Sequence, residues 1–404
     1  MKAKPPYIKN SSGWRKGVAI MDRRKFFESG LLAAGLSLSG GSESRGAAAA
    51  SGELKMKYRT LGRTGLKVSE VCFGTYGWQN TPVLETALEA GINLISTCAD
   101  YQNGQAERAI GPAVARRRDK LVLSSGIDCM RNPGEQEMLD RLEKSLENLQ
   151  TTYLDLYVPH QADTLENVTN PAIPRAFEKM KKAGKARFLG ISTHSSQLEP
   201  MLDRAIDLGY FDFLLCKYNF MEYKSQMKIF ERAAEKNLGI ITFKIRAGAG
   251  EAEVKALQEK GLELNQARIR WALTNRNVTS VCAHFNNFSA VNEVLQTVNT
   301  AFSETDGRLL DQYRQAFDNR YCRGCGTCEK SCPYGVDVKN ILRYQMYFKC
   351  YGFEKEALAR YAALPQNAGP ASCESCSAPC ERACPHGLPT RSRMLQAAGT
   401  LAAV

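Results

Sequence analysis

The chain has 404 residues, of which 44% are hydrophobic, and a formal net charge of +12. This length accommodates one large domain and a small one, and the composition excludes a chain that is disordered throughout. Residues 1–50 hold 9 of the Lys and Arg residues and 3 of the Asp and Glu residues, which leaves 45 basic and 39 acidic residues, a net charge of +6, elsewhere. We therefore expect no nucleic-acid partner, because such a partner calls for a strongly basic face.

The first 50 residues have the features of a targeting signal. Twin arginines in the run Asp22-Arg23-Arg24-Lys25 precede a weakly apolar stretch at 30–39 and the small residues Ala47-Ala48-Ala49. This order is typical of a Tat-type signal, and it predicts export to the periplasm from a start at Met1 or Met21. A basic amphipathic segment that arose by chance is the alternative. No run reaches about eighteen apolar residues, so we expect no transmembrane anchor after signal cleavage.

Residues 56–300 alternate short apolar runs with amphipathic segments. In the segment 135–149, Met138, Leu142, Leu146 and Leu149 recur at spacings of four, four and three, which predicts a helix with one apolar face. Eight runs rich in β-branched or aromatic residues predict strands at 71–74, 93–97, 121–124, 154–159, 187–192, 211–217, 239–243 and 279–283. Eight such units favour an α/β fold of the (β/α)8 barrel type. A doubly wound sheet is the alternative, but Gly74-Thr75-Tyr76-Gly77 after the first strand is not its glycine fingerprint.

Several stretches of this region resemble the aldo/keto reductase family. They are residues 57–68 with Gly62, Thr64, Gly65 and Leu66, then Gly91-Ile92-Asn93, Tyr153-Leu154-Asp155-Leu156-Tyr157 with His160, Gly184-Lys185-Ala186-Arg187 before Gly190-Ile191-Ser192, and Tyr218-Asn219. The resemblance covers nearly all of residues 56–300, and it implies a (β/α)8 barrel with an active site at the carboxyl ends of the strands. Together with the cysteine runs described below, it extends to the branch of the family that has a C-terminal ferredoxin-like domain.

The family has a catalytic tetrad of Asp, Tyr, Lys and His, in which the Tyr gives a proton to a carbonyl oxygen as NADPH gives a hydride. The resemblance makes Tyr101 and His160 the catalytic residues, whereas Ser96 stands at the Asp position and Gly126 at the Lys position. Losing both members of a buried ion pair can leave stability nearly unchanged, whereas losing one is costly. The two substitutions therefore indicate that the Asp and Lys positions changed together. Without a neighbouring ammonium, we expect Tyr101 to titrate near the ordinary tyrosine pKa of about 10. A slipped alignment that puts Asp100 at the Asp position is the alternative.

The nucleotide site of the family is only partly present. The residues that the resemblance assigns to cofactor binding are Ser192, Phe243, Lys244 and Arg246. By contrast, Thr193 and Leu215 stand where the family has an Asn and a Gln, and the family's glycine after the eighth strand is absent. NADP(H) is therefore one candidate cofactor of the barrel rather than a required one.

Three of the four histidines follow predicted strands at the same end of the barrel. His160, His194 and His284 come after the fourth, fifth and eighth strands. Three imidazoles can hold a catalytic metal. Strands four and eight lie across a barrel from each other, which favours separate roles as pocket-lining side chains.

Residues 322–404 contain two runs of four cysteines. The first run reads C-x2-C-x2-C-x3-C-P and ends at Pro333, and the second, which ends at Pro385, has one extra residue between its second and third cysteines. The first spacing is typical of bacterial two-cluster ferredoxins, in which the fourth cysteine of a run ligates the other cluster. This resemblance predicts two [4Fe–4S] clusters, one held by Cys322, Cys325, Cys328 and Cys384 and the other by Cys373, Cys376, Cys380 and Cys332.

Structural zinc and disulfide bonds are the alternatives for these cysteines. Zinc ribbons carry two well-separated pairs, whereas the first run places four thiols within eleven residues. Cysteines two apart pair poorly with each other, and stapling does not explain two similar runs of four. The twin-arginine signal agrees independently, because the Tat route exports proteins that are already folded around their cofactors.

These patterns predict a signal at 1–50, a barrel at 56–300, a helical connector at 301–321 and an iron–sulfur domain at 322–404. The aromatic residues expected to pack around the clusters or against the barrel are Tyr344, Tyr347, Phe348, Tyr351 and Phe353. The predicted function is an exported iron–sulfur oxidoreductase of the aldo/keto reductase type. Its expected partners are a redox protein or a small-molecule carbonyl substrate. A non-catalytic electron-transfer or scaffold protein is the alternative.

Overall fold

The computed structural model describes residues 54–402 except 78–79, 196–197, 223, 225, 249–255, 257–258 and 260–262. The predicted signal at 1–50 lies outside the described residues. Within them, none of the helices has both the length and the apolar character needed to span a bilayer.

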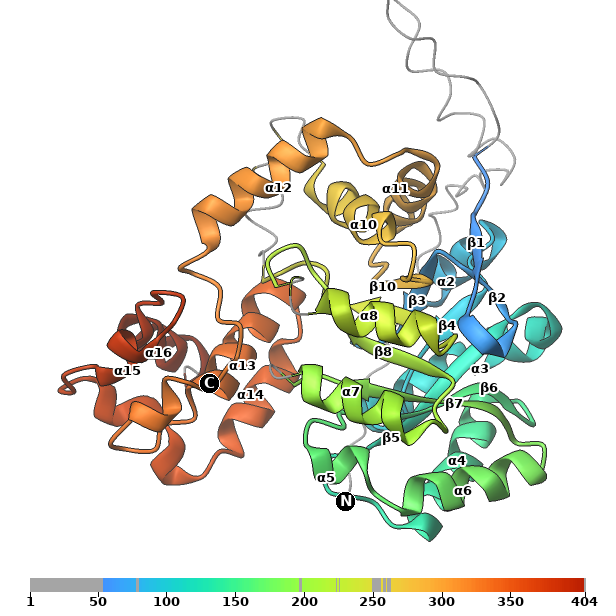
Figure 1. The fold of residues 1–404 in the computed structure, drawn as a ribbon, viewed down its shortest axis with the longest axis horizontal. Coiled ribbons are helices and arrows are strands. Elements are labelled where there is room, and N and C mark those ends of the chain that lie inside the picture. The colour runs from blue at the N-terminus through green and yellow to red at the C-terminus, as the bar shows by residue number, and fades with distance from the viewer. Residues whose placement is uncertain are drawn as a thin grey trace, which may run out of the picture. The chain divides into compact units, whose positions relative to one another are not determined.

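Eight parallel strands close into a barrel, which confirms the predicted (β/α)8 barrel (Figure 1). The strands are β3 (Val71–Gly74), β4 (Leu94–Ser96), β5 (Val122–Asp128), β6 (Leu154–His160), β7 (Ala186–Thr193), β8 (Phe213–Lys217), β9 (Gly239–Phe243) and β10 (Ser280–Ala283). Neighbours in the barrel follow the chain order, and β10 pairs with β3 to close the ring. All eight predicted strands are present, so a doubly wound open sheet is excluded.

Helices pack around the barrel and bury its outer face. They are α2 (Thr81–Glu89), α3 (Gln105–Arg117), α4 (Glu135–Leu149), α5 (Leu165–Val168), α6 (Ala172–Lys182), α7 (Leu198–Leu208), α8 (Gln226–Glu235), α10 (Leu264–Thr274) and α11 (Phe288–Asn299). Helix α4 has the predicted bounds, and all four of its regularly spaced apolar side chains are buried. Burial of each such side chain contributes about 1.5–3 kcal/mol, so this face fixes the helix against the strands.

A short hairpin covers the amino-terminal end of the barrel. Strands β1 (Tyr58–Thr60) and β2 (Lys67–Ser69) pair antiparallel. Leu61, in the turn between them, is fully buried and packs with apolar side chains of the barrel interior such as Leu156. The hairpin therefore closes this end, and the carboxyl ends of the strands remain as the end that can hold a site.

The chain continues from the barrel into a helical C-terminal region. Helix α12 (Glu304–Phe317) leads to α13 (Val338–Tyr351), α14 (Glu354–Ala362), α15 (Pro379–Ala383) and α16 (Thr390–Leu401) (Figure 1). This region has its own apolar core, which includes Ile341, Ala357 and Met394, together with Cys328 and Cys380 from the two cysteine runs.

Two glycines on barrel loops allow the C-terminal region to pack closely against the barrel. A Cβ atom on Gly77 would lie 2.2 Å from the ring of Phe353, and one on Gly248 would lie 2.6 Å from the ring of Tyr321. Both glycines also have positive φ angles, which other residues adopt at a cost. A buried ion pair at 2.7 Å joins Lys217 to Glu222, which accepts a hydrogen bond of 2.5 Å from the Tyr321 hydroxyl.

Candidate active site and cysteine pockets

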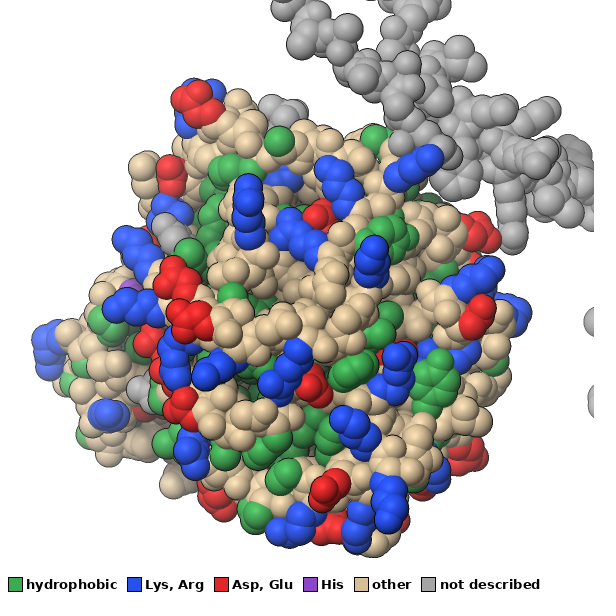
Figure 2. Space-filling model, turned by 45° about the vertical axis from the view of Figure 1, so that its right-hand side comes forward, with side chains coloured by type: hydrophobic (Ala, Val, Ile, Leu, Met, Phe, Trp, Pro, Cys, Tyr) green, Lys and Arg blue, Asp and Glu red, His purple; other side chains and the backbone are tan. Residues whose placement is uncertain are grey.

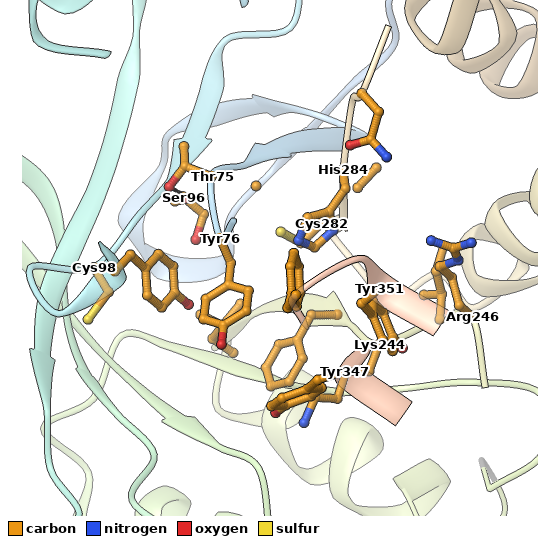
Figure 3. Close-up of a pocket in the computed structure, with 18 of the residues that line it drawn as sticks. Thr75, Tyr76, Ser96, Cys98, Lys244, Arg246, Cys282, His284, Tyr347 and Tyr351 are labelled. Carbon is orange, nitrogen blue, oxygen red and sulfur yellow. Dashed lines mark hydrogen bonds between the residues drawn. The ribbon is translucent and has the colours of Figure 1, made fainter. Parts of the chain in front are cut away.

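A cavity of about 590 Å3 lies at the carboxyl ends of the barrel strands. Strand ends and the loops after them supply one part of its wall, and α13 and α14 supply another. Figure 3 shows Ser96 and Tyr76 on the barrel side and Tyr347 and Tyr351 from α13 facing the same space. The volume suits a small organic ligand, and the location is the usual one for a barrel active site.

Tyr101 and His160 both line this cavity, as expected for catalytic residues. Their ring centroids are 6.0 Å apart. Burial lowers the pKa of His160 to about 4, although Asp100 and a hydrogen bond to the Thr97 backbone oppose this effect. The imidazole is therefore neutral at pH 7. Its Nε2 atom is buried and has no hydrogen-bond partner in the described protein, so it is available to a ligand in the cavity.

The expectation that Tyr101 titrates near its ordinary value is wrong. Burial raises its pKa well above that value, and nearby thiols and tyrosines add to the effect. The ring of Tyr76 packs edge-on against Tyr101, with centroids 4.9 Å apart. Sequence reasoning considered only the missing ammonium, whereas the desolvation that dominates here depends on side chains brought from distant parts of the chain.

Comparison with known proteins places the barrel in a family. Residues 70–253 match the sequence model of the aldo/keto reductase family. These residues form an aldo/keto reductase domain. The match ends before the first cysteine run, so it says nothing of the C-terminal region.

Individual relatives agree with this assignment. The chain is 30% identical over 160 residues to the aldo-keto reductase YhdN of Bacillus subtilis, an alignment that covers 35% of this chain and 48% of the relative. It is 25% identical over 302 residues to the L-galactose dehydrogenase of Arabidopsis thaliana, covering 64% of this chain and 92% of that protein. The chain thus spans about half the length of the first of these relatives.

A solved structure shows the same fold. The holo form of the aldo-keto reductase AKR11C1 from Bacillus halodurans superposes with a TM-score of 0.52 at 23% identity, covering 64% of this chain and 96% of that one. At this level of identity the likeness concerns the fold alone.

The aldo/keto reductase domain has Ser96 at the family's Asp position and no room for a side chain at the family's Lys position. Ser96 is buried and lines the cavity. At Gly126, a Cβ atom would lie 1.7 Å from the carbonyl oxygen of Val158 on the neighbouring strand. No side chain fits there with this backbone. Asp100, the alternative carboxylate, accepts a hydrogen bond of 2.8 Å from the Asp128 amide and pairs with Arg141.

Of the predicted nucleotide-binding residues, Ser192, Phe243, Lys244 and Arg246 all line the cavity. The Ser192 hydroxyl and the Arg246 Nε are buried and have no hydrogen-bond partner among the described residues. However, the Thr193 hydroxyl donates a hydrogen bond of 3.1 Å to Asp163, and Leu215 is apolar. Two of the three side chains that the resemblance assigns to the nicotinamide amide are therefore absent, and NADP(H) stays one candidate cofactor of the barrel.

The three histidines line one cavity but do not form a metal site. His160, His194 and His284 all face it. No three His, Cys, Asp or Glu side chains in the described part of the chain are close enough to share one metal ion. The Nδ1 of His194 lies 3.2 Å from the Lys244 ammonium instead. The structure thus supports the interpretation that they are pocket-lining side chains.

Sequence reasoning missed the contribution of α13 and α14 to the active-site wall. Tyr347, Tyr351 and Phe353 line the cavity together with Glu356 and Arg360, which form an ion pair. The aromatic residues of α13 gave a signal, but that signal did not distinguish packing around the clusters from packing against the barrel. Tyr347 does both, because it also belongs to the core of the C-terminal region.

The eight cysteines of the two runs line two further pockets. One is lined by Cys322, Cys325, Cys328 and Cys384, and the other by Cys332, Cys373, Cys376 and Cys380. Each pocket thus receives three cysteines from one run and the last cysteine of the other run. No disulfide joins any of the 14 cysteines, all of which lie in described residues. The assignment of these cysteines as cluster ligands stays a prediction.

Proposed function

We propose that the protein is an exported iron–sulfur oxidoreductase of the aldo/keto reductase type. In this proposal a site at the barrel mouth exchanges electrons with two [4Fe–4S] clusters in the C-terminal region. One observation carries the proposal: α13 connects the two cysteine runs in sequence, and its Tyr347 and Tyr351 line the barrel cavity. The same helix therefore belongs both to the core around the cysteines and to the wall of the active site.

The cysteine pockets support two cubane clusters rather than two zinc ions. Each pocket offers four thiols in the crossed arrangement that two-cluster ferredoxins use. The spacing C-x2-C-x2-C-x3-C-P of the first run favours a cluster over zinc, because zinc ribbons carry two well-separated pairs of cysteines. When bound, such clusters supply one-electron transfer.

The chemistry of the barrel side is that of two neutral side chains. Tyr101 stays a protonated phenol and His160 a neutral imidazole near pH 7, because both are desolvated. Such groups can orient an oxygen of a small carbonyl or hydroxyl compound, which is the substrate class that we propose. Because two of the nicotinamide contacts that the resemblance implies are absent, we assign the supply of electrons to the clusters and, through them, to an external redox protein.

The proposed location is the periplasm, reached by the Tat route. It rests on the twin arginines Arg23 and Arg24 and the apolar run after them, all of which lie outside the described residues. Export in a folded state agrees with a protein that acquires its clusters before it leaves the cytoplasm.

The decisive experiment is anaerobic purification of the full chain, followed by iron and acid-labile sulfide analysis. We expect about eight iron and eight sulfide per chain, and EPR signals of reduced [4Fe–4S] clusters after dithionite treatment. Colourless protein that contains zinc and no acid-labile sulfide would falsify the redox assignment and leave only the barrel assignment in place.

A second candidate is a non-catalytic electron-transfer protein in which the barrel serves as a docking module. The absence of both the Asp and the Lys of the family favours it. Carbonyl-reduction assays with dithionite-reduced protein separate the two candidates. Turnover that falls at least about 100-fold in Tyr101→Phe supports the enzyme, because a positioned acid or hydrogen-bond donor contributes about that much. Reversible cluster reduction without turnover of any carbonyl supports the docking module.

A further inference from the structure

A second and smaller cavity, of about 90 Å3, adjoins the barrel-mouth cavity. Residues after the barrel strands line one side, and α13, residues 320–324 and Arg393 of α16 line the other. His194 and Lys244 line both cavities. Their contact of 3.2 Å therefore forms part of the wall between the two spaces. Figure 3 shows Lys244 beside Tyr347, whose ring centroid lies 5.8 Å from the Lys244 Nζ.

The smaller cavity is strongly basic. Among the described residues, eight Lys and Arg residues line it and no Asp or Glu does. Three of the cations have a carboxylate partner nearby, namely Lys217 with Glu222, Arg323 with Asp318, and Lys339 with Glu329. The described residues provide no carboxylate partner for the other five, of which Arg320 and Lys349 are exposed to solvent and Lys244, Arg343 and Arg393 are half-buried. On the face drawn in Figure 2, side chains of both charge signs are interspersed.

Two buried donors in the cavity wall also lack an acceptor. Gln345 is 2% exposed, and its Nε2 has no hydrogen-bond partner in the described protein. The same is true of the buried Nε of Arg393. Buried donors are nearly always satisfied in native proteins, and leaving one unmade is costly. A ligand rich in acceptor oxygens would satisfy both.

Lys244 is a desolvated amine in the wall of this cavity. Burial lowers its pKa well below the ordinary lysine value, Arg343 and Lys217 add to the effect, and Asp163 and Glu222 oppose it. Its nearest polar contact is an imidazole nitrogen rather than a carboxylate. An anion beside this ammonium would favour the charged form and remove the repulsion.

We propose that the smaller cavity is a binding site for a compact tetrahedral oxyanion of the phosphate type. A volume of about 90 Å3 holds several times the about 10–15 Å3 that one water molecule needs, so such an ion fits. A whole nucleotide is too large for this space. The ligand is either free phosphate or the phosphate group of a small organic molecule.

The competing explanation is that the cations only balance the negative charge of a cluster at Cys322, which also lines the cavity. Two observations favour the oxyanion. The unpartnered amide of Gln345 is neutral and adds nothing to charge balance. Lys244 belongs to the barrel and pairs with His194 at the wall between the two cavities. The proposal does not depend on reductase activity.

The test is calorimetric titration of the anaerobically purified full chain with inorganic phosphate in a chloride buffer. We expect one saturable site. Arg343→Gln should weaken it at least about tenfold, because a charge-assisted hydrogen bond is lost, and Gln345→Leu should weaken it severalfold. Lys181→Gln, which removes an exposed cation from α6, is the matched control and should change affinity by less than about twofold. Circular dichroism checks that each variant is folded. If Arg343→Gln or Gln345→Leu is not folded, Arg393→Gln is titrated in its place.

A second titration with methyl phosphate distinguishes the two sources of the ligand. Binding of inorganic phosphate alone identifies the free ion, whereas equal or tighter binding of methyl phosphate identifies a phosphate monoester. The proposal is wrong if no saturable site appears up to about 10 mM, an affinity too weak to matter. It is also wrong if Arg343→Gln and Gln345→Leu behave like Lys181→Gln. A shift of the cluster potential in Arg343→Gln without phosphate binding would assign the cations to the cluster.

Discussion

A side chain at Gly126 should destabilise the barrel, and this is the sharpest test of the altered active site. The Cβ atom of Gly126→Ala would lie 1.7 Å from the Val158 carbonyl oxygen, where about 3.0 Å is the shortest distance that real Cβ atoms show. The two strands would have to separate by at least about 1.3 Å. That movement disturbs the parallel pairing of β5 with β6, which runs from Ser124 to Asp128.

Gly126→Ala should lower the free energy of unfolding substantially, although the substitution removes no contact. Overpacking a well-packed core costs about 1–3 kcal/mol, and here the obstructing atom is backbone that cannot rotate away. We expect about 3 kcal/mol or more. In a domain of this size, each kcal/mol lowers the melting temperature by about 2–4 °C, so Gly126→Ala should melt at least about 6 °C below wild type.

Melting followed by intrinsic fluorescence under anaerobic conditions, at one scan rate, measures this difference. Gly307→Ala is the matched control, because Gly307 lies inside α12 and its Cβ would meet only the Phe302 ring at 3.9 Å. This control should be stabilised by about 0.5–1 kcal/mol. If Gly126→Ala melts within about 1 °C of wild type, the backbone accepts a side chain at this position and the steric argument fails.

Three further predictions concern buried charge and the cysteines. Glu222→Gln should destabilise the protein by about 3–5 kcal/mol, because it leaves the buried ammonium of Lys217 unpaired. Burial opposes ionisation of Glu222, but Lys217 and the Tyr321 hydroxyl outweigh it and lower the pKa of this carboxyl. The stabilisation by ionised Glu222 is therefore present above the unfolded pKa of about 4.3 and is lost as pH falls through the lower folded pKa. The difference in melting temperature between wild type and Glu222→Gln should accordingly shrink in acid. Tyr101→Phe should leave the tyrosinate absorbance that develops between about pH 9 and 11 unchanged, since the Tyr101 phenol does not ionise there; a loss of one tyrosine equivalent in this range would contradict its burial. Cys332→Ser should remove about half of the iron and the EPR signal of one cluster, whereas loss of all iron or of none would argue against two separate clusters.

The local sequence was sufficient to predict the elements of the barrel. The strands at 239–243 and 71–74 have the predicted bounds because each is a short β-branched or aromatic run that ends at a turn. Helix α4 is equally local, since its apolar spacing alone defines a buried face. Chain order then fixed the topology, because successive parallel strands with helical crossovers close a barrel in one sense only.

The cysteine runs were also a local signal, and they remain the strongest sequence evidence for redox chemistry. Ligand spacing depends on the reach of a few backbone bonds, so it can be read without knowing the fold. The family resemblance likewise identified Tyr101 and His160, which the structure brings to one cavity.

What the sequence determined by itself was the set of elements, the cysteine motifs and the residue types at the family's catalytic positions. Tertiary structure alone decided that α13 and α14 line the candidate active site, that Val158 bars a side chain at Gly126, and that eight Lys and Arg residues line one small cavity. The physical reason is that sequence patterns record short-range preferences. Desolvation, steric exclusion and uncompensated charge arise only where segments far apart in the chain come into contact.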